Sequence, residues 1–218
     1  MNKKIKPTNI PLQEIQKYYK EVPNFIYYRL RSMKEIYYID NSELSEMVVR
    51  ALYDKLEDTA GYVYLYNNQY YLFAVNESVI YHEINHIINL KTLLKEFKLN
   101  YLDVLNIDDK GWTDDKISFN FIYEFIAEYA STVILKRSNQ YEYLKFLLAK
   151  KKFKLDENLA YYMGSCVALD CEDNKSEKIK KVGKLLMNCI ILDGFKVVSV
   201  NTEQVMKIIK NLKQYLLE

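Results

Sequence analysis

The chemistry that this sequence could support is concentrated in one short pattern, H-E-x-x-H, formed by His82, Glu83 and His86. Four residues make slightly more than one helical turn, so both imidazoles would project from one face of a helix and could bind one cation. Zinc is the metal that this pattern typically holds, and zinc lowers the pKa of a bound water to about 7. Glu83 could accept the proton of that water at neutral pH. The pattern therefore predicts a zinc site that activates water for hydrolysis.

Two observations favour this prediction over a chance pair of helical histidines on a solvated face. The chain contains only two His, and both lie in the pattern. The residues around the pattern are mostly apolar, namely Val79, Ile80, Ile84, Ile87, Ile88 and Leu90. A helix with apolar residues on most sides should be buried, where ionisable side chains need a partner or a metal. A metal site is therefore the more economical interpretation.

The third ligand has to be sought outside the pattern, because a catalytic zinc site usually has three protein ligands and one open position. The three Cys have neither C-x-x-C spacing nor a His nearby, which predicts reduced core thiols rather than a disulfide framework or a metal site. A carboxylate should therefore complete the site. The apolar helix predicted over residues 118–135 contains Glu124 and Glu128, which are four residues apart and so share a face. The residues alone leave three alternatives open: either Glu as the ligand, or both in a solvated stripe.

The elements that must position these residues follow from apolar periodicity and turn residues. Helices are expected at about 11–21, 42–58, 77–97, 118–135, 139–150, 156–170, 175–191 and 201–217. Strands are expected at 35–39, in a hairpin of 62–66 and 70–75 around an Asn turn, and at 195–200 after Gly194. Asn76 or Ser78 should cap the helix that carries the pattern. The acidic stretch 100–116 lacks the spacing of a calcium loop and is expected to be a solvated loop.

These elements predict a mixed α+β fold that is mostly helical, with a small antiparallel sheet packed on the H-E-x-x-H helix. At 218 residues, half of them hydrophobic, the chain is long enough for a sizeable core. We expect a single domain over residues 1–218, with a catalytic core at about 42–138 and a C-terminal helical part at about 139–218.

Charge and hydropathy limit the kinds of partner that we expect for this chain. The net charge is +2 with no long basic run, so nucleic acid is not an expected partner. The basic N-terminus is not followed by the apolar stretch of a signal peptide, and no run approaches the length of about 18 apolar residues that a membrane span requires. We therefore expect a soluble, cytoplasmic protein whose partner is a protein or peptide substrate.

H-E-x-x-H followed by a helix of the form E-x-x-A-E-Y, here Glu124 to Tyr129, resembles the gluzincin type of zinc metallopeptidase. The resemblance implies a zincin-like fold in which a small sheet lies along the active-site helix and its edge strand pairs with extended peptide. It also implies Zn²⁺ bound by His82, His86 and Glu124, with Glu83 as the catalytic base. Glu128 would accept the remaining N–H of a ligand His and orient its ring.

A second resemblance gives a different ligand. Residues 60–135 are also similar to the small H-E-x-x-H proteins of bacteria and their phages, including the ImmA/IrrE-type anti-repressor peptidases. In that alignment Glu128, which precedes a segment of small residues, would bind the metal. One helical turn separates the two carboxylates by about 5.4 Å, so only one of them can bond to a single zinc. We expect Glu124, because its order in the helix matches the gluzincin pattern.

The function that follows is a soluble, intracellular zinc-dependent endopeptidase from a Gram-positive bacterium or one of its mobile elements. The resemblance implies hydrolysis of peptide bonds by metal-activated water, selective for a regulatory protein target. The alternative is a non-catalytic interaction or regulatory protein that keeps the zincin fold and binds its partner through the helices after residue 139. Glu83 favours the enzyme, because a purely structural zinc site would not need that carboxylate.

Overall fold

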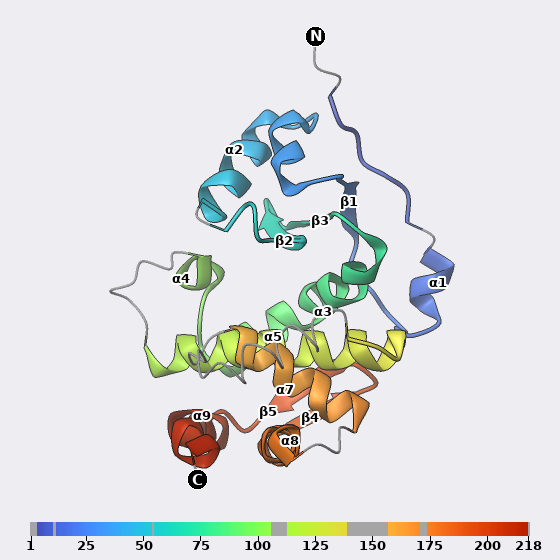
Figure 1. Ribbon diagram of the computed structural model, residues 1–218. Coiled ribbons are helices and arrows are strands. Elements are labelled where there is room, and N and C mark those ends of the chain that lie inside the picture. The colour runs from blue at the N-terminus through green and yellow to red at the C-terminus, as the bar shows by residue number, and fades with distance from the viewer. Residues whose placement is uncertain are drawn as a thin grey trace. The chain divides into compact units, whose positions relative to one another are not determined.

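The computed structural model describes residues 4–10, 12–53, 55–105, 113–138, 157–170 and 174–217. The fold is a mixed α+β arrangement in which helices predominate, as expected (Figure 1). The chain divides into two compact units, Met1–Ile88 and Asn89–Glu218, and the division falls inside helix α3 (Ile80–Glu96). Within the described residues, no helix is both long and apolar enough to cross a membrane. The expected single-domain organisation stays a prediction.

The first unit contains a small sheet, several short helices and the beginning of α3. Its elements before α3 are α1 (Leu12–Gln16), β1 (Phe25–Arg29), the 3-10 helix η1 (Met33–Tyr38), α2 (Ser42–Ala51), β2 (Gly61–Tyr66), β3 (Gln69–Ala74) and the 3-10 helix η2 (Glu77–Val79). The helices expected at 11–21 and 42–58 are therefore shorter than periodicity suggested. Helix α2 begins after Asn41, whose side chain accepts a hydrogen bond from the Leu44 N–H, and ends at Ala51.

The predicted hairpin is confirmed, because β2 and β3 pair in antiparallel register from Gly61 opposite Ala74 to Tyr66 opposite Gln69. Its turn residues Asn67 and Asn68 have φ angles of 49° and 59°. Two consecutive residues with positive φ are typical of the tight hairpin turn whose twist matches the strands, and Asn tolerates that backbone at low cost.

Two details of the expected sheet are wrong. The strand order is β1-β3-β2 with β1 parallel to β3, so the three-stranded sheet is mixed rather than antiparallel. The strand expected at 35–39 is a 3-10 helix, η1, and the third strand is β1 instead. The Ser32 side chain caps η1 by accepting from the Lys34 N–H, and Ile36 is fully buried beneath the turn. This local capping outweighs the strand propensity of a Tyr- and Ile-rich segment.

Helix α3 is apolar around much of its circumference, as its sequence predicts. Ile84, Ile87, Leu90 and Leu93 are at most 2 % exposed. The Asn76 side chain accepts hydrogen bonds from the backbone N–H groups of the first turn of η2, which leads directly into α3. The expected cap at position 76 is therefore confirmed.

The second unit contains the later half of α3, five further helices and a two-stranded sheet among its described residues. These elements are α4 (Tyr101–Leu105), α5 (Asp114–Leu135), α7 (Glu157–Leu169), α8 (Asn174–Met187), β4 (Ile190–Asp193), β5 (Lys196–Val200) and α9 (Thr202–Leu217). The helix expected at 139–150 lies outside the described residues. The helix expected at 175–191 is wrong at its end, because the chain turns into β4 after Met187.

The two strands β4 and β5 form an antiparallel hairpin around Gly194, whose φ is 63°. Polar side chains of α3 bind the backbone of this hairpin. The buried Asn89 amide donates to the Phe195 carbonyl (3.1 Å) and accepts from the Val197 N–H (2.8 Å). The later half of α3 is thereby part of the second unit.

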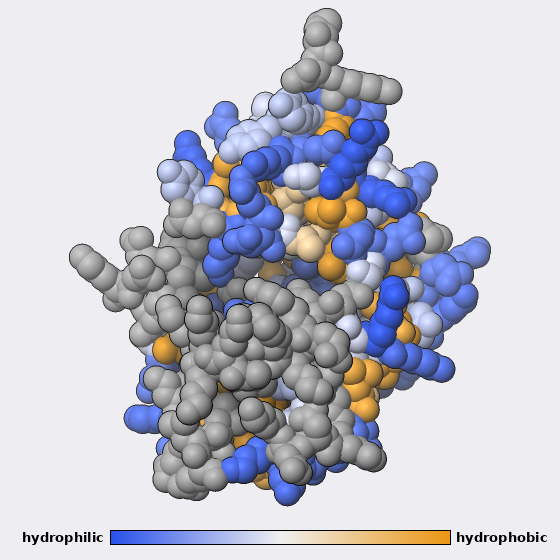
Figure 2. Space-filling view, viewed as in Figure 1, coloured by the Kyte–Doolittle hydropathy of each residue, from blue (hydrophilic) through white to orange (hydrophobic). Residues whose placement is uncertain are grey.

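The surface drawn in Figure 2 mixes the two kinds of residue. In its upper part, where the sheet and α2 lie in Figure 1, orange hydrophobic residues alternate with blue hydrophilic ones. The orange areas visible there are separated from one another by charged or polar side chains.

Candidate metal centre

Helix α3 holds the two histidines as the sequence predicts. The ring centroids of His82 and His86 are 4.7 Å apart, and the ring planes are nearly perpendicular at 82°. His86 is buried, with 6 % of its surface exposed. One turn of a regular helix therefore places both imidazoles on one side of α3.

Glu124, in the middle of α5, joins the histidines to form a group that could hold a metal ion. His82, His86 and Glu124 each offer one ligand atom, and these atoms all lie within 4.8 Å of one another. The Glu124 side chain is partly exposed. This is the three-residue set that the gluzincin resemblance implies.

Glu83 lies against the start of the hairpin. Its side chain is buried, with 6 % exposed. A Cβ atom at position 61 would lie 2.5 Å from Glu83 Oε1 and 2.9 Å from its Cδ and Cγ, distances at which atoms overlap. Only glycine therefore fits at Gly61, the first residue of β2, while Glu83 keeps this position. The sequence contains no local signal for this contact, because the two residues are far apart along the chain.

Glu128 is buried one turn after Glu124 and is held by hydroxyl groups. Its Oε1 accepts hydrogen bonds from the hydroxyls of Thr132 (3.2 Å), Ser138 (2.9 Å) and Ser165 (2.9 Å). The Ser165 and Ser138 hydroxyl oxygens are also 2.8 Å apart. Three hydroxyl donors stabilise a carboxylate that would otherwise be costly to bury. The expectation that Glu128 orients a ligand His stays a prediction.

Ser165 reaches Glu128 because helices α5 and α7 approach closely at Gly164. A Cβ atom at position 164 would lie 2.6 Å from the Phe125 carbonyl oxygen and 2.9 Å from the Tyr129 amide nitrogen. Both are backbone atoms, so α7 could not keep this distance with a larger residue. Sequence reasoning missed Ser165, which reads as one small residue in an apolar helix.

A second set of contacts that the sequence did not indicate supports the first turn of α3. Tyr19, which follows α1, accepts a hydrogen bond from the Asn85 amide (2.5 Å) and donates to the Tyr81 carbonyl (3.4 Å). The Asn85 amide also donates to the Tyr81 carbonyl (3.0 Å). Burial raises the pKa of Tyr19, so its hydroxyl keeps the proton that this arrangement requires. Tyr19 thereby ties the chain after α1 to the part of α3 that flanks His82.

Sulfur ligands are not part of the group. Cys166 is a buried free thiol and Cys189 a partly exposed one, so Cys189 is not the core thiol that was expected, while Cys171 lies outside the described residues. A comparison of this chain with protein families, with curated proteins and with solved structures finds no match in any of the three.

Proposed function

We propose that this chain is a zinc-dependent endopeptidase of the gluzincin type that hydrolyses peptide bonds in a selected protein substrate. The observation that carries the proposal is the group of His82, His86 and Glu124, whose ligand atoms lie within 4.8 Å of one another. Glu83 adds a buried carboxylate between the two histidines in the sequence. Metal-assisted hydrolysis of this kind needs two imidazole ligands, one carboxylate ligand and a separate base.

The donor set fits zinc in chemistry and in spacing. Zinc is commonly bound by His nitrogen and Glu oxygen at about 2.0–2.2 Å, and two His with one Glu is a known catalytic combination. Tetrahedral geometry at those distances places neighbouring ligand atoms about 3.4 Å apart. Since the three atoms already lie within 4.8 Å of one another, small side-chain rotations would bring them to a common ion. Three protein ligands would leave the fourth position open.

Zinc bound there would polarise the scissile carbonyl and make a water acidic enough to lose its proton at neutral pH. Glu83 is the residue that we assign to proton transfer. Its carboxylate would accept the proton of the attacking water and then donate it to the leaving amine nitrogen. Its carboxylate occupies the space that a Cβ atom at position 61 would fill, which Gly61 leaves open. This space matters for the base, because proton transfer requires hydrogen-bond distance from the water.

A peptide is the substrate class that the sheet favours. Strand β2 is at one edge of the three-stranded sheet, and its first residue, Gly61, lies next to Glu83. An extended peptide that added to this edge by backbone hydrogen bonds would run past the base. Pairing of this kind recognises a peptide backbone, which supports a protein or peptide as the substrate.

The test compares wild-type protein with the Glu83→Gln variant for zinc content and for cleavage of a proteome-derived peptide library, read by mass spectrometry. Glu83→Gln should keep its zinc and lose about 10²- to 10⁴-fold in rate, the usual contribution of a general base. Glu203→Gln, an exposed position on α9, is the matched control and should keep both. Equal cleavage by wild type and Glu83→Gln would contradict the proposal, as would a wild-type protein that binds no zinc.

The ligand assignment has its own test. Glu124→Gln should abolish zinc binding, because it removes an anionic ligand, whereas Glu128→Gln should weaken it by about ten- to a hundredfold. Glutamine at position 128 can still accept hydrogen bonds from the hydroxyls around it. If zinc titration shows the greater loss in Glu128→Gln, then Glu128 is the ligand and the ImmA/IrrE-type alignment is the better one.

A further inference from the structure

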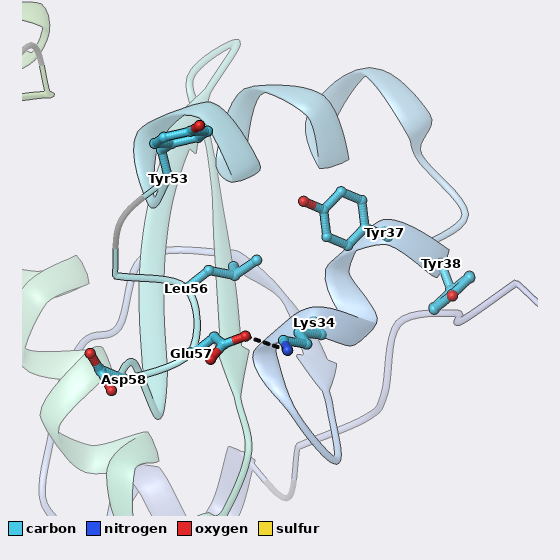
Figure 3. Close-up of a pocket in the computed structure, with 7 residues that line it drawn as sticks. All are labelled: Lys34, Tyr37, Tyr38, Tyr53, Leu56, Glu57 and Asp58. Carbon is cyan, nitrogen blue, oxygen red and sulfur yellow. Dashed lines mark ion pairs between the residues drawn. The ribbon is translucent and has the colours of Figure 1, made fainter.

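A surface hollow of about 550 Å³ lies in the first unit and is lined by none of the residues of the candidate metal centre (Figure 3). Its lining residues are Lys34, Tyr37, Tyr38, Tyr53, Leu56, Glu57 and Asp58. They come from two short segments, the 3-10 helix η1 and the stretch that follows α2. The hollow is therefore built by a compact part of the chain whose elements η1 and α2 pack together.

The backbone explains why these side chains meet. In a 3-10 helix, residues three apart lie directly above one another, so Lys34 and Tyr37 project from the same side of η1. Figure 3 shows Tyr37 and Tyr53 on either side of the hollow, with Leu56 between them and Lys34 and Glu57 below. Leu56 is only 9 % exposed and forms an apolar base.

The tyrosine rings of the hollow face solvent to an unusual extent. Tyr37, Tyr38 and Tyr53 are 59 %, 45 % and 81 % exposed. Aromatic rings carry negative potential on their faces, which attracts cations that come within about 6 Å of the ring centre. Several exposed rings around one depression are more typical of binding surfaces than of the rest of a protein surface.

The charged residues of the hollow favour a cation in the same place. Lys34 forms an ion pair with Glu57. The hydrogen bond that Lys34 donates to Glu57 raises the pKa of Lys34 and lowers the pKa of Glu57. Asp58 makes no ion pair with the residues that the structure describes. With two carboxylates against one ammonium group, the lining is net negative.

We propose that this hollow binds the guanidinium group of an arginine side chain in a partner polypeptide, which stacks on the tyrosine rings and takes the place of Lys34 opposite Glu57. Lys34 is already a cation on a flexible apolar stem in this position. A guanidinium suits the site better than an ammonium, because it is planar, weakly hydrated, stacks on aromatic rings and bonds a carboxylate through two N–H groups. This inference does not depend on the proposed peptidase activity.

The test uses three short blocked peptides that differ in one residue, either arginine, its neutral analogue citrulline, or phenylalanine. Binding is followed by NMR of the full-length protein with labelled tyrosine rings. The arginine peptide should shift the Tyr37 and Tyr53 ring signals saturably, with a dissociation constant in the millimolar range expected for one side chain. Citrulline has the same shape without the charge, so it should bind at least about fivefold more weakly if a charged contact operates.

Variants of the hollow locate the binding. Tyr53→Ala should weaken the arginine peptide by about two- to fivefold, whereas Tyr53→Phe, which keeps the ring, should not. Glu57→Gln should weaken binding, and Lys34→Met should strengthen it because the internal competitor is gone. The exposed Lys17–Glu14 pair provides the matched control, since Glu14→Gln breaks a similar ion pair outside the hollow and should have no effect.

Four results would overturn the proposal. The first is equal binding of the arginine and citrulline peptides, which would remove the role of charge. The second is tighter binding of the phenylalanine peptide, which would make the hollow an apolar docking site. The third is an arginine affinity that Glu57→Gln and Tyr53→Ala both leave unchanged. The fourth is no saturable binding of the arginine peptide at all.

Discussion

Substitution of Gly61 by alanine should separate the placement of the proposed base, Glu83, from the proposed binding of metal. The backbone at Gly61 lies outside the left-handed region, so alanine is acceptable there and would by itself stabilise the protein by about 0.4–1 kcal/mol through the unfolded state. The new Cβ, however, would lie 2.5 Å from Glu83 Oε1, whereas ordinary contacts begin at 3.4 Å. The Glu83 carboxylate would therefore have to retreat by about 0.9 Å, from 2.5 to 3.4 Å.

A displacement of this size is large for catalysis and small for folding. Misplacement of a reacting group by about 1 Å can reduce the rate by about 10²-fold. The clash involves a side chain that can rotate, so the free energy of unfolding should change by no more than about 1 kcal/mol, in either direction. Glu83 is not a ligand in the proposed set, so zinc stoichiometry should be unchanged. We therefore expect Gly61→Ala to fold, bind zinc and cleave peptide about a hundredfold more slowly.

The assay measures cleavage, zinc per chain and the free energy of unfolding in Gly61→Ala, Glu83→Gln and the double variant. If alanine acts through the Glu83 carboxylate, it should reduce the rate little further once that carboxylate is gone, so the two effects should not add. Wild-type cleavage by Gly61→Ala would refute the reasoning about placement. Loss of zinc in Gly61→Ala would refute the separation of base and ligands.

The remaining predictions concern packing, pH and metal. Gly164→Ala should destabilise the protein by about 1–3 kcal/mol in chemical denaturation, because its Cβ would meet the backbone of α5, including the Phe125 carbonyl; an unchanged free energy of unfolding would contradict this. The Asp170 pKa is lowered from its ordinary value of 3.8, chiefly by a hydrogen bond from Lys180, so the ion pair should stabilise the protein above that value and lose its effect as the pH falls through the lowered pKa. The difference in unfolding free energy between wild type and Asp170→Asn should accordingly be present near neutrality and vanish in acid, and a difference that is constant with pH would exclude the charge. A chelator should lower the thermal midpoint, and added zinc should restore it. Zinc at a hundredfold excess over its dissociation constant adds about 2.7 kcal/mol to the free energy of unfolding. A midpoint insensitive to both would argue against a metal in the folded state.

Local patterns explain the parts of the structure that the sequence predicted. The i, i+4 spacing of His82 and His86 determines their common face as soon as the segment is helical. The apolar flanks predicted the burial of α3, and the Asn pair predicted the β2–β3 turn. Each of these features depends on residues within a few positions of one another, so single-sequence reasoning can reach them.

Contacts between distant segments explain what the sequence did not predict. The approach of Gly61 to Glu83 joins a strand to a helix, and the approach of Ser165 to Glu128 joins α7 to α5. Neither pair has a spacing rule, because each depends on how whole elements pack. The parallel pairing of β1 with β3 likewise follows from long-range topology. The segment that forms η1 is preceded by a serine cap, Ser32, although its composition suits a strand equally well.

X-ray absorption spectroscopy at the zinc edge, on the purified protein loaded with one equivalent of zinc, tests the central claim most directly. If His82, His86 and Glu124 hold the metal, the first shell should contain only nitrogen and oxygen at about 2.0–2.2 Å, with outer-shell scattering from two imidazole rings. Replacement of Glu124 by glutamine should abolish this spectrum and leave free zinc. A sulfur shell at about 2.3 Å, or zinc without imidazole scattering, would contradict the assignment of these three ligands.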